Sequence, residues 1–190
     1  MKFCSDCGHS LILAIPAGDL RERFICSHCG RIHYQNPNLV VGVIAHWQDQ
    51  VLLCRRGIEP QKGLWCLPAG FMENGESSDE GAMREAKEET CAELEIQSLY
   101  AVYNLPHINQ TYMYYRAKLL SPKVEAGLET LEAQLFKQNE IPWSQLAYPS
   151  IAAALQQFFI DHKSSQSGEE KYPLIHETIS NQASLLGNAS

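Results

Sequence analysis

Long apolar runs are absent from the sequence. No uninterrupted apolar stretch approaches the roughly 18 residues that a membrane-spanning helix needs. The N-terminal segment MKFCSDCGHS also lacks the apolar stretch of a secretion signal. We therefore expect a cytoplasmic protein without a membrane partner. Since apolar residues still make up 45% of the chain, they are numerous enough to form a buried core.

An excess of positive charge is also lacking, because 15 Lys and Arg residues face 22 Asp and Glu residues and give a net charge of −7. Proteins that bind duplex nucleic acid broadly need Lys and Arg clustered against its phosphates. We therefore do not expect a nucleic-acid partner. A single nucleotide could still bind in a pocket that a metal ion makes locally positive.

The seven cysteines divide into two kinds. Four of them form two C-x-x-C pairs with the spacing C-x₂-C-x₁₈-C-x₂-C: Cys4, Cys7, Cys26 and Cys29. Each pair can present two thiolates from one tight turn, and four thiolates complete a tetrahedron around Zn²⁺. Such a site has no open coordination position, so we expect a structural role; two redox dithiols are the alternative. Cys54, Cys66 and Cys91 are expected to fill space as small apolar side chains.

Composition divides the chain into three regions. We predict a small zinc ribbon over residues 1–34, a main domain over 35–162 and a polar C-terminal tail over 163–190, although the tail segment KYPLIHETI could dock. Within the main domain, β-branched stretches such as LVVGVIAHW predict strands, and residues 78–91 and 149–162 predict helices. This mixed order favours an α+β fold in which helices pack on a sheet.

The helix predicted over 78–91 carries an unusual group of acidic residues. Glu85, Glu88 and Glu89 are spaced three and four apart, so they project from nearly one face. Their mutual repulsion would be relieved by Mg²⁺, a hard cation that binds oxygen ligands. Arg84 lies four residues before Glu88 and can orient its carboxylate. The alternative is an ordinary solvated helix face.

The segment GFMENGESSDEGAMREAKEETCA resembles the box that defines the Nudix hydrolases, G-x₅-E-x₇-R-E-U-x-E-E-x-G-U, where U is a bulky aliphatic residue. Six positions fall in register: Gly70, Glu76, Arg84, Glu85, Glu88 and Glu89. Cys91 stands where the second Gly of the box belongs, and Ala86 and Ala92 replace its aliphatic residues. We therefore expect a slightly different exit from the helix at Cys91.

The resemblance implies a Nudix α/β/α sandwich with a mixed sheet, preceded by a zinc ribbon. It also implies Glu85 and Glu89 as ligands of Mg²⁺ or Mn²⁺. Glu88 would complete the cluster or position water, and the carbonyl of Ala69 would be a further ligand.

The other positions of the box would shape the site. The resemblance implies that Arg84 acts with the catalytic carboxylates, and that Glu76 and Arg84 hold the loop and helix in place. Gly70, which lets the loop bend sharply, and Glu76 would border the bound substrate.

Further segments, including VLLCRR and GLWCLPAGFMENGES, resemble a Nudix subgroup that carries an N-terminal zinc ribbon. Its members hydrolyse ADP-ribose, FAD or related ADP-containing compounds, which implies AMP and a phosphorylated partner as products. The S-Q-P-W-P-F-P motif of NADH diphosphatases is absent here. NADH or nucleoside triphosphate pyrophosphohydrolysis, RNA decapping, and a nucleic-acid- or protein-binding module with a weakly active domain are the alternatives. A homodimer is common among similar enzymes.

Residues outside the box are weaker candidates. Arg55 and Arg56 follow a predicted strand, only one of them should point inward, and we favour Arg55 as a phosphate contact. Glu132 is our choice for a late-loop general base, ahead of Glu129. One member of an aromatic group could stack on adenine, but strand alternation sends only part of this group to one face: Tyr103, Tyr112, Tyr114 and Tyr115.

Overall fold

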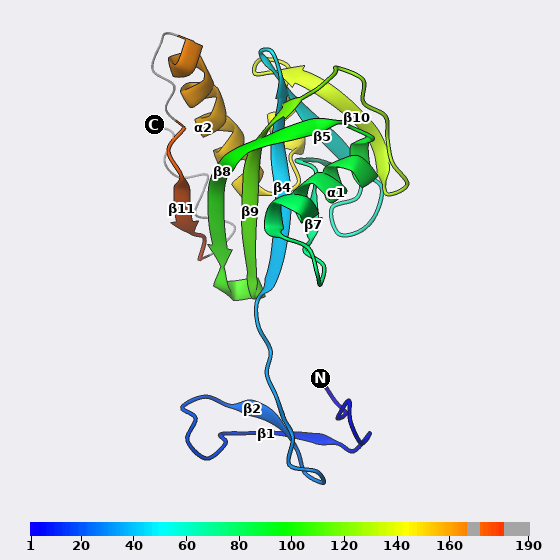
Figure 1. The fold of residues 1–190 in the computed structure, drawn as a ribbon, viewed down its shortest axis with the longest axis vertical. Helices are drawn as coiled ribbons and strands as arrows, with labels where there is room; N and C mark the ends of the chain where they lie inside the picture. The colour runs from blue at the N-terminus through cyan, green and yellow to red at the C-terminus, as the bar shows by residue number, and fades with distance from the viewer. Residues whose placement is uncertain (167–171, 181–190) are drawn as a thin grey trace. The chain divides into compact units, whose positions relative to one another are not determined.

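The chain divides into two compact units, Met1–Asn36 and Pro37–Ser190. The structure is a computed structural model that describes residues 1–166 and 172–180 (Figure 1). Within these residues, no helix combines the length and the apolar character needed to cross a membrane.

The first unit is a small antiparallel sheet in the order β1-β2-β3. Its strands are β1 (Leu11–Ala14), β2 (Arg23–Cys26) and β3 (Ile32–His33). Two glycines, Gly8 and Gly30, each adopt φ 73° directly after a cysteine pair, a conformation that glycine takes without strain.

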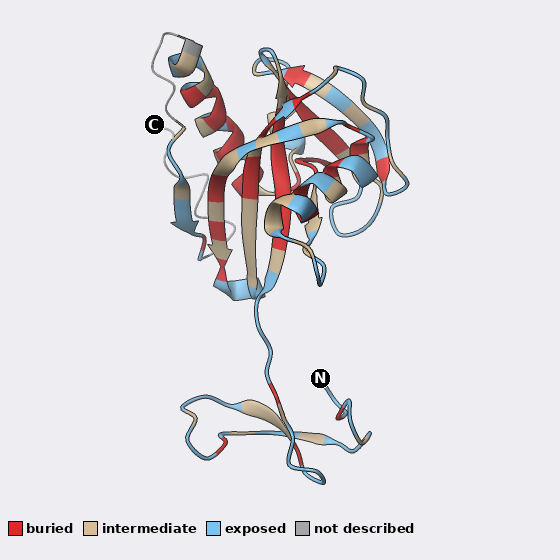
Figure 2. Cartoon of the chain, viewed as in Figure 1, coloured by how far each residue is buried: buried red, intermediate tan, exposed pale blue. Residues whose placement is uncertain are grey.

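Little apolar surface is buried in this unit (Figure 2). Its buried side chains include Cys4, Cys26 and His33, whereas Phe3 and Leu20 are exposed. A unit of this size needs a further source of stability beyond its core.

The second unit is built on an eight-stranded mixed sheet with the strand order β10-β5-β4-β9-β8-β11, in which β6 pairs with β5 and β7 pairs with β4. The β4–β9 and β11–β8 pairs are parallel, and the remaining pairs are antiparallel. The strands are β4 (Asn38–Trp47), β5 (Gln50–Arg56), β6 (Trp65–Cys66), β7 (Ala69–Phe71), β8 (Leu94–Leu105), β9 (Gln110–Leu119), β10 (Thr130–Lys137) and β11 (Ile175–Thr178).

Two α-helices pack on the sheet, α1 (Ser78–Thr90) and α2 (Pro149–Gln166); short 3₁₀ turns occur at η1 (Pro106–Ile108) and η2 (Trp143–Gln145). Strand β4 shows why the helices lie on opposite faces (Figure 1). Val43 belongs to the apolar cluster that contains Ala82 and Ala86 of α1. The next residue, Ile44, belongs to the cluster that contains Leu155 of α2. Since successive side chains of a strand alternate between faces, β4 is buried on both sides. The predicted α+β sandwich with a mixed sheet is confirmed.

The C-terminal region contributes more regular structure than its polar composition predicts. Helix α2 continues past the predicted end at 162 to Gln166. The segment KYPLIHETI, expected to be able to dock, supplies β11, in which Ile175 pairs with Ala101 of β8. Polar edge strands such as this lack the apolar alternation that identifies a strand in a sequence. Residues 167–171 and 181–190 of the predicted tail lie outside the described residues.

Helix α1 ends at Cys91 in the left-handed conformation that glycine favours, with φ 51° and ψ 14°. The altered exit expected from the replacement of glycine is therefore not seen. A neighbouring loop holds the helix end, because the amides of Glu125 and Gly127 donate to the carbonyls of Thr90 and Glu89, both at 2.9 Å. The chain keeps this exit although Cβ of Cys91 makes the conformation strained.

Replacing Cys91 with Gly should therefore raise the free energy of unfolding by about 1 kcal/mol, because it removes the steric cost of a left-handed residue. Urea denaturation of the full chain measures this change. Cys91→Ala is the matched control, since it removes the thiol but keeps Cβ. Equal stabilisation by both variants would show that the thiol, and not the backbone conformation, is responsible.

Candidate functional site

One guanidinium, that of Arg84, joins the loop before α1 to the acidic face of the helix. Its Nε and Nη2 donate to the two carboxylate oxygens of Glu76 at 3.0 and 2.9 Å. Its Nη1 donates to Glu85 at 2.8 Å and to Glu88 at 3.1 Å. Hydrogen bonds from Arg84, and one from the amide of Glu73, lower the pKa of Glu76 to about 2. Glu76 and Arg84 thus form a fixed charged clamp that orients two further carboxylates.

Glu89 is held from the opposite direction by the strands under the helix. Its carboxylate accepts the Ala69 amide at 3.0 Å and the Cys54 thiol at 3.5 Å. Burial raises its pKa to about 7, and burial also raises the pKa of Glu85. Glu85 and Glu89 are partly desolvated and lie one helical turn apart, so their negative charges repel each other and are poorly solvated. A bound cation would offset both effects.

The carboxylates of α1 do not converge as tightly as the ribbon thiols do. Among the described residues, groups of three or more metal-ligating atoms within 4.8 Å of one another occur only in the first unit. Glu85 and Glu88 are instead drawn to Arg84, and Glu89 is drawn to the Ala69 amide. The oxygen donors match the preference of Mg²⁺ or Mn²⁺, so the residues fit a hard divalent ion.

Gly70 makes room for the carboxylate of Glu85. A Cβ built on Gly70 would lie 2.3 Å from the carboxylate carbon and from both oxygens of Glu85. The carboxylate of Glu85 can therefore occupy its present position only because this residue lacks a side chain.

Gly70→Ala should lower catalytic turnover by roughly a hundredfold, because the new methyl group displaces Glu85 by an ångström or more. Steady-state kinetics with the substrates proposed below measures the loss. In a Glu85→Gln background, the same substitution should cause little further loss, since both changes act through one side chain. Additive losses would show that Gly70 acts elsewhere.

The four paired cysteines of the first unit converge on one point, and all of their sulfur atoms lie within 4.8 Å of one another. The Cys7–Cys26, Cys7–Cys29 and Cys4–Cys29 sulfur separations are 3.4, 3.6 and 3.7 Å. His33 is buried with Nε2 3.3 Å from Sγ of Cys4, where it can orient that thiolate. Four converging sulfur atoms fit the tetrahedral coordination of zinc.

Comparison with protein families accounts for both units. Residues 2–35 match the zinc-ribbon family described as Nudix N-terminal, and residues 36–158 match the NUDIX domain. The chain belongs to the Nudix hydrolase family. A crystal structure of a NUDIX hydrolase from Nitrosomonas europaea is 48% identical, covers 95% of this chain and 100% of its own, and superimposes with a TM-score of 0.87.

Curated relatives are more distant. An ADP-ribose pyrophosphatase of Methanocaldococcus jannaschii is 32% identical over 115 residues, which are 57% of this chain and 67% of that protein. The NAD-capped RNA hydrolase NudC of Photobacterium profundum is 26% identical over 142 residues, or 74% of this chain and 52% of that protein. The chain thus spans about two thirds of the first relative and about half of the second.

The two arginines that end β5 in the Nudix domain have different surroundings. Arg55, the residue favoured from the sequence, donates to the Gly63 carbonyl at 2.8 Å and lies 3.9 Å from Glu132. Burial would lower the pKa of Arg56, but nearby Tyr148, Cys66 and Glu89 raise it.

The charge of Glu89 is one of the causes that raise the pKa of Arg56, whereas Arg55, the arginine favoured from the sequence, pairs with Glu132. Arg56 is two residues from Cys54, which contacts Glu89, so strand alternation places the side chains of Arg56 and Cys54 on the same face of β5.

The other candidates differ in their partners and in their exposure. Glu132 of β10 pairs with Arg55 of β5, and its side chain is 48% exposed. Of the aromatic group, Tyr103 and Tyr114 are fully buried in the core, whereas Tyr112 is only half-buried. Tyr112 is thus the member that a ligand can reach most directly.

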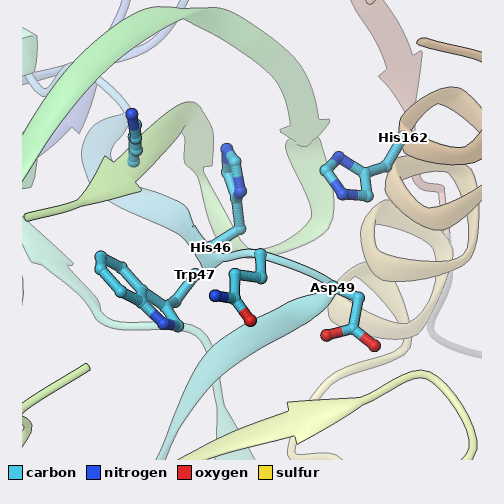
Figure 3. Close-up of a pocket in the computed structure, with 6 residues that line it drawn as sticks. His46, Trp47, Asp49 and His162 are labelled. Atoms are coloured by element: carbon cyan, nitrogen blue, oxygen red, sulfur yellow. The ribbon is translucent and has the colours of Figure 1, made fainter. Parts of the chain in front are cut away.

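A separate pocket of about 530 Å³ lies beside the turn that joins β4 and β5 (Figure 3). It is lined by His46, Trp47, Gln48, Asp49, Lys118 and His162. The ring centroids of His46 and His162 are 5.2 Å apart. None of the residues predicted for the Nudix site lines it.

Proposed function

We propose that the protein is a Mg²⁺-dependent diphosphatase of ADP-containing nucleotides, with ADP-ribose and FAD as the leading substrates. The carboxylate face of α1, fixed by Arg84 on one side and by the Ala69 amide on the other, carries this proposal. The similarity to an ADP-ribose pyrophosphatase supports the choice of substrate. The products are AMP and a phosphorylated partner.

Glu85 and Glu89 would hold the metal, together with Glu88 and the carbonyl of Ala69. When bound, Mg²⁺ or Mn²⁺ supplies neutralisation of the diphosphate and a lower pKa for coordinated water. Arg84 keeps Glu85 and Glu88 oriented toward the site.

The strands below the helix fix the remaining carboxylate. The Cys54 thiol and the Ala69 amide hold one oxygen of Glu89, which leaves its other oxygen for the ion. In the net reaction, water adds to one phosphorus and the anhydride P–O bond breaks, which gives two phosphate monoesters. Glu132 stays our prediction for the general base.

A substrate panel tests the proposal. The zinc-loaded chain is incubated with Mg²⁺ and each of ADP-ribose, FAD, NADH and the nucleoside triphosphates, and products are identified by chromatography. AMP should appear from ADP-ribose or FAD, and no turnover of any compound would refute the proposal. The NudC relatives are named as NAD-capped RNA hydrolases, which keeps nicotinamide dinucleotides as the second candidate, so preferential cleavage of NADH would reassign the substrate.

The two units are proposed to differ in role. Residues 1–34 act as a structural zinc ribbon, and residues 35–162 hold the chemistry, with the end of α2 and strand β11 added from the region after 162. A binding-module role for the ribbon would instead appear as retention of nucleic acid in a low-salt filter-binding assay. Light scattering would decide whether the chain forms the homodimer common among similar enzymes.

A further inference from the structure

A second group of metal-binding side chains lies beside the sulfur cluster of the first unit. The ligand atoms of Cys7, His9 and His28 all lie within 4.8 Å of one another. His9 lies two residues after the first C-x-x-C pair, and His28 lies within the second pair. The turns that bring the four sulfur atoms together therefore also bring the two imidazoles together. Ligand atoms of a tetrahedral zinc ion lie roughly 3.3–3.8 Å apart, so small rotations of these side chains would complete the coordination.

The two imidazole rings are packed against each other rather than spread into solvent. Their centroids lie 3.9 Å apart, and their planes are 6° from parallel. Nδ1 of His9 lies 3.1 Å from the carbonyl oxygen of Cys7, to which its N–H can donate. A histidine that binds a metal ion commonly donates one ring N–H to a carbonyl group, which orients the ring and leaves the other nitrogen for the ion. The surroundings of His9 are thus those of a metal ligand.

Charge favours a second cation at this place. Four thiolates outweigh the charge of one Zn²⁺, so the loaded sulfur cluster stays negative. Cys4 and Cys26 are buried, so this charge is accessible on the side of Cys7 and Cys29. A thiolate sulfur keeps lone pairs after it has bound one ion, and it can therefore bridge to another. The sulfur of Cys7 combines this accessibility with two neighbouring imidazoles.

We propose that Cys7, His9 and His28 form a second transition-metal site, in which the Cys7 thiolate bridges to the structural zinc. One thiolate and two imidazoles select Zn²⁺ and similar borderline ions over Mg²⁺ or Ca²⁺. Three protein ligands leave one tetrahedral position open to water or a small ligand, unlike the closed four-sulfur site. Since both histidines are exposed, the second ion should exchange with solvent faster than the structural one. This inference does not depend on the proposed function.

Titration of the full chain with Co²⁺ tests the inference. The chain carries one equivalent of zinc, excess Mg²⁺ occupies the carboxylates of α1, and Cys91→Ser removes the exposed thiol of that helix end. One equivalent of Co²⁺ should bind with a sulfur-to-cobalt charge-transfer band, which oxygen ligands do not produce. His9→Asn and His28→Asn should each weaken this binding by roughly a hundredfold, since each removes one of three ligands. His176→Asn, at an exposed histidine of β11, is the matched control.

Zinc content and the absorption band separate the outcomes. Loss of cobalt binding in both histidine variants, with one zinc retained per chain, would support the second site. The absence of a bound equivalent at millimolar Co²⁺ would overturn it, as would binding that persists in both variants. Cobalt binding without the charge-transfer band would overturn the bridging role of Cys7. Loss of the structural zinc from either variant would show that the histidines belong to the first ion, and this result would also count against the proposal.

Discussion

Glu89→Gln is expected to lower kcat for ADP-ribose by roughly a thousandfold, which corresponds to the loss of several kcal/mol of metal-assisted transition-state stabilisation. The substitution keeps the shape of the side chain but replaces a charged oxygen ligand by a neutral amide. This substitution should lower kcat more than the substitution of any exposed residue. Glu89 is the most buried carboxylate of the acidic face, and two hydrogen bonds hold it in place. Initial rates at saturating Mg²⁺ measure the change.

Stability distinguishes a catalytic defect from misfolding in this variant. Burial raises the pKa of Glu89 to about 7, so above that pH the folded protein carries a buried negative charge that lowers its free energy of unfolding. Glu89→Gln should therefore be at least as stable as the wild type at pH 8, while its activity is lost. Glu93→Gln is the matched control, because Glu93 is exposed and pairs only loosely with Lys87 at 3.7 Å. A Glu89→Gln variant near the wild-type rate would mean that another residue holds the ion.

Removal of zinc is expected to unfold the first unit and leave the second unit folded. Structural zinc contributes on the order of 10 kcal/mol to the folding of small cysteine-ligated units. The strands of this unit are at most four residues long, and thiols and one imidazole occupy much of its interior. Hydrogen exchange after chelation should show loss of amide protection over residues 1–34 and retained protection in β4 and β9.

A pair of serine variants provides the control for zinc removal. Cys26→Ser, at a buried member of the sulfur cluster, should reproduce the effect of chelation, whereas Cys91→Ser should not. If metal analysis shows that zinc has been removed but the amide protons of residues 1–34 remain protected, the small sheet folds without the ion. The two C-x-x-C pairs would then be better explained as dithiols.

Short-range patterns in the sequence were sufficient where the geometry is local. The predicted helix over 78–91 matches α1 to within one residue, and Arg84 pairs with Glu88 as its spacing indicated. The register of the box and the spacing of the cysteines identified the family because each motif keeps fixed intervals between its members, and the closest members share one helix or one tight turn. Sequence separation within such elements fixes distance in space.

Longer-range relations could not be obtained in this way. Arg55 and Arg56 are adjacent, and the sequence could not say which one belongs to the strand face that contacts Glu89. The pairing of Glu132 with Arg55 was also not readable from the sequence, since it is set by the register of β10 against β5. The pairing of β11 with β8 was also hidden, because the two strands lie far apart in the sequence.

The sequence by itself determined the family, the sulfur cluster and the acidic face of α1, because helix periodicity and knuckle spacing are properties of a few consecutive residues. Only the tertiary structure decided that Gly70 makes room for Glu85, that Arg56 lies next to Tyr148, and that β11 pairs with β8. These contacts join residues from separate elements, and they follow from packing and register rather than from any local pattern.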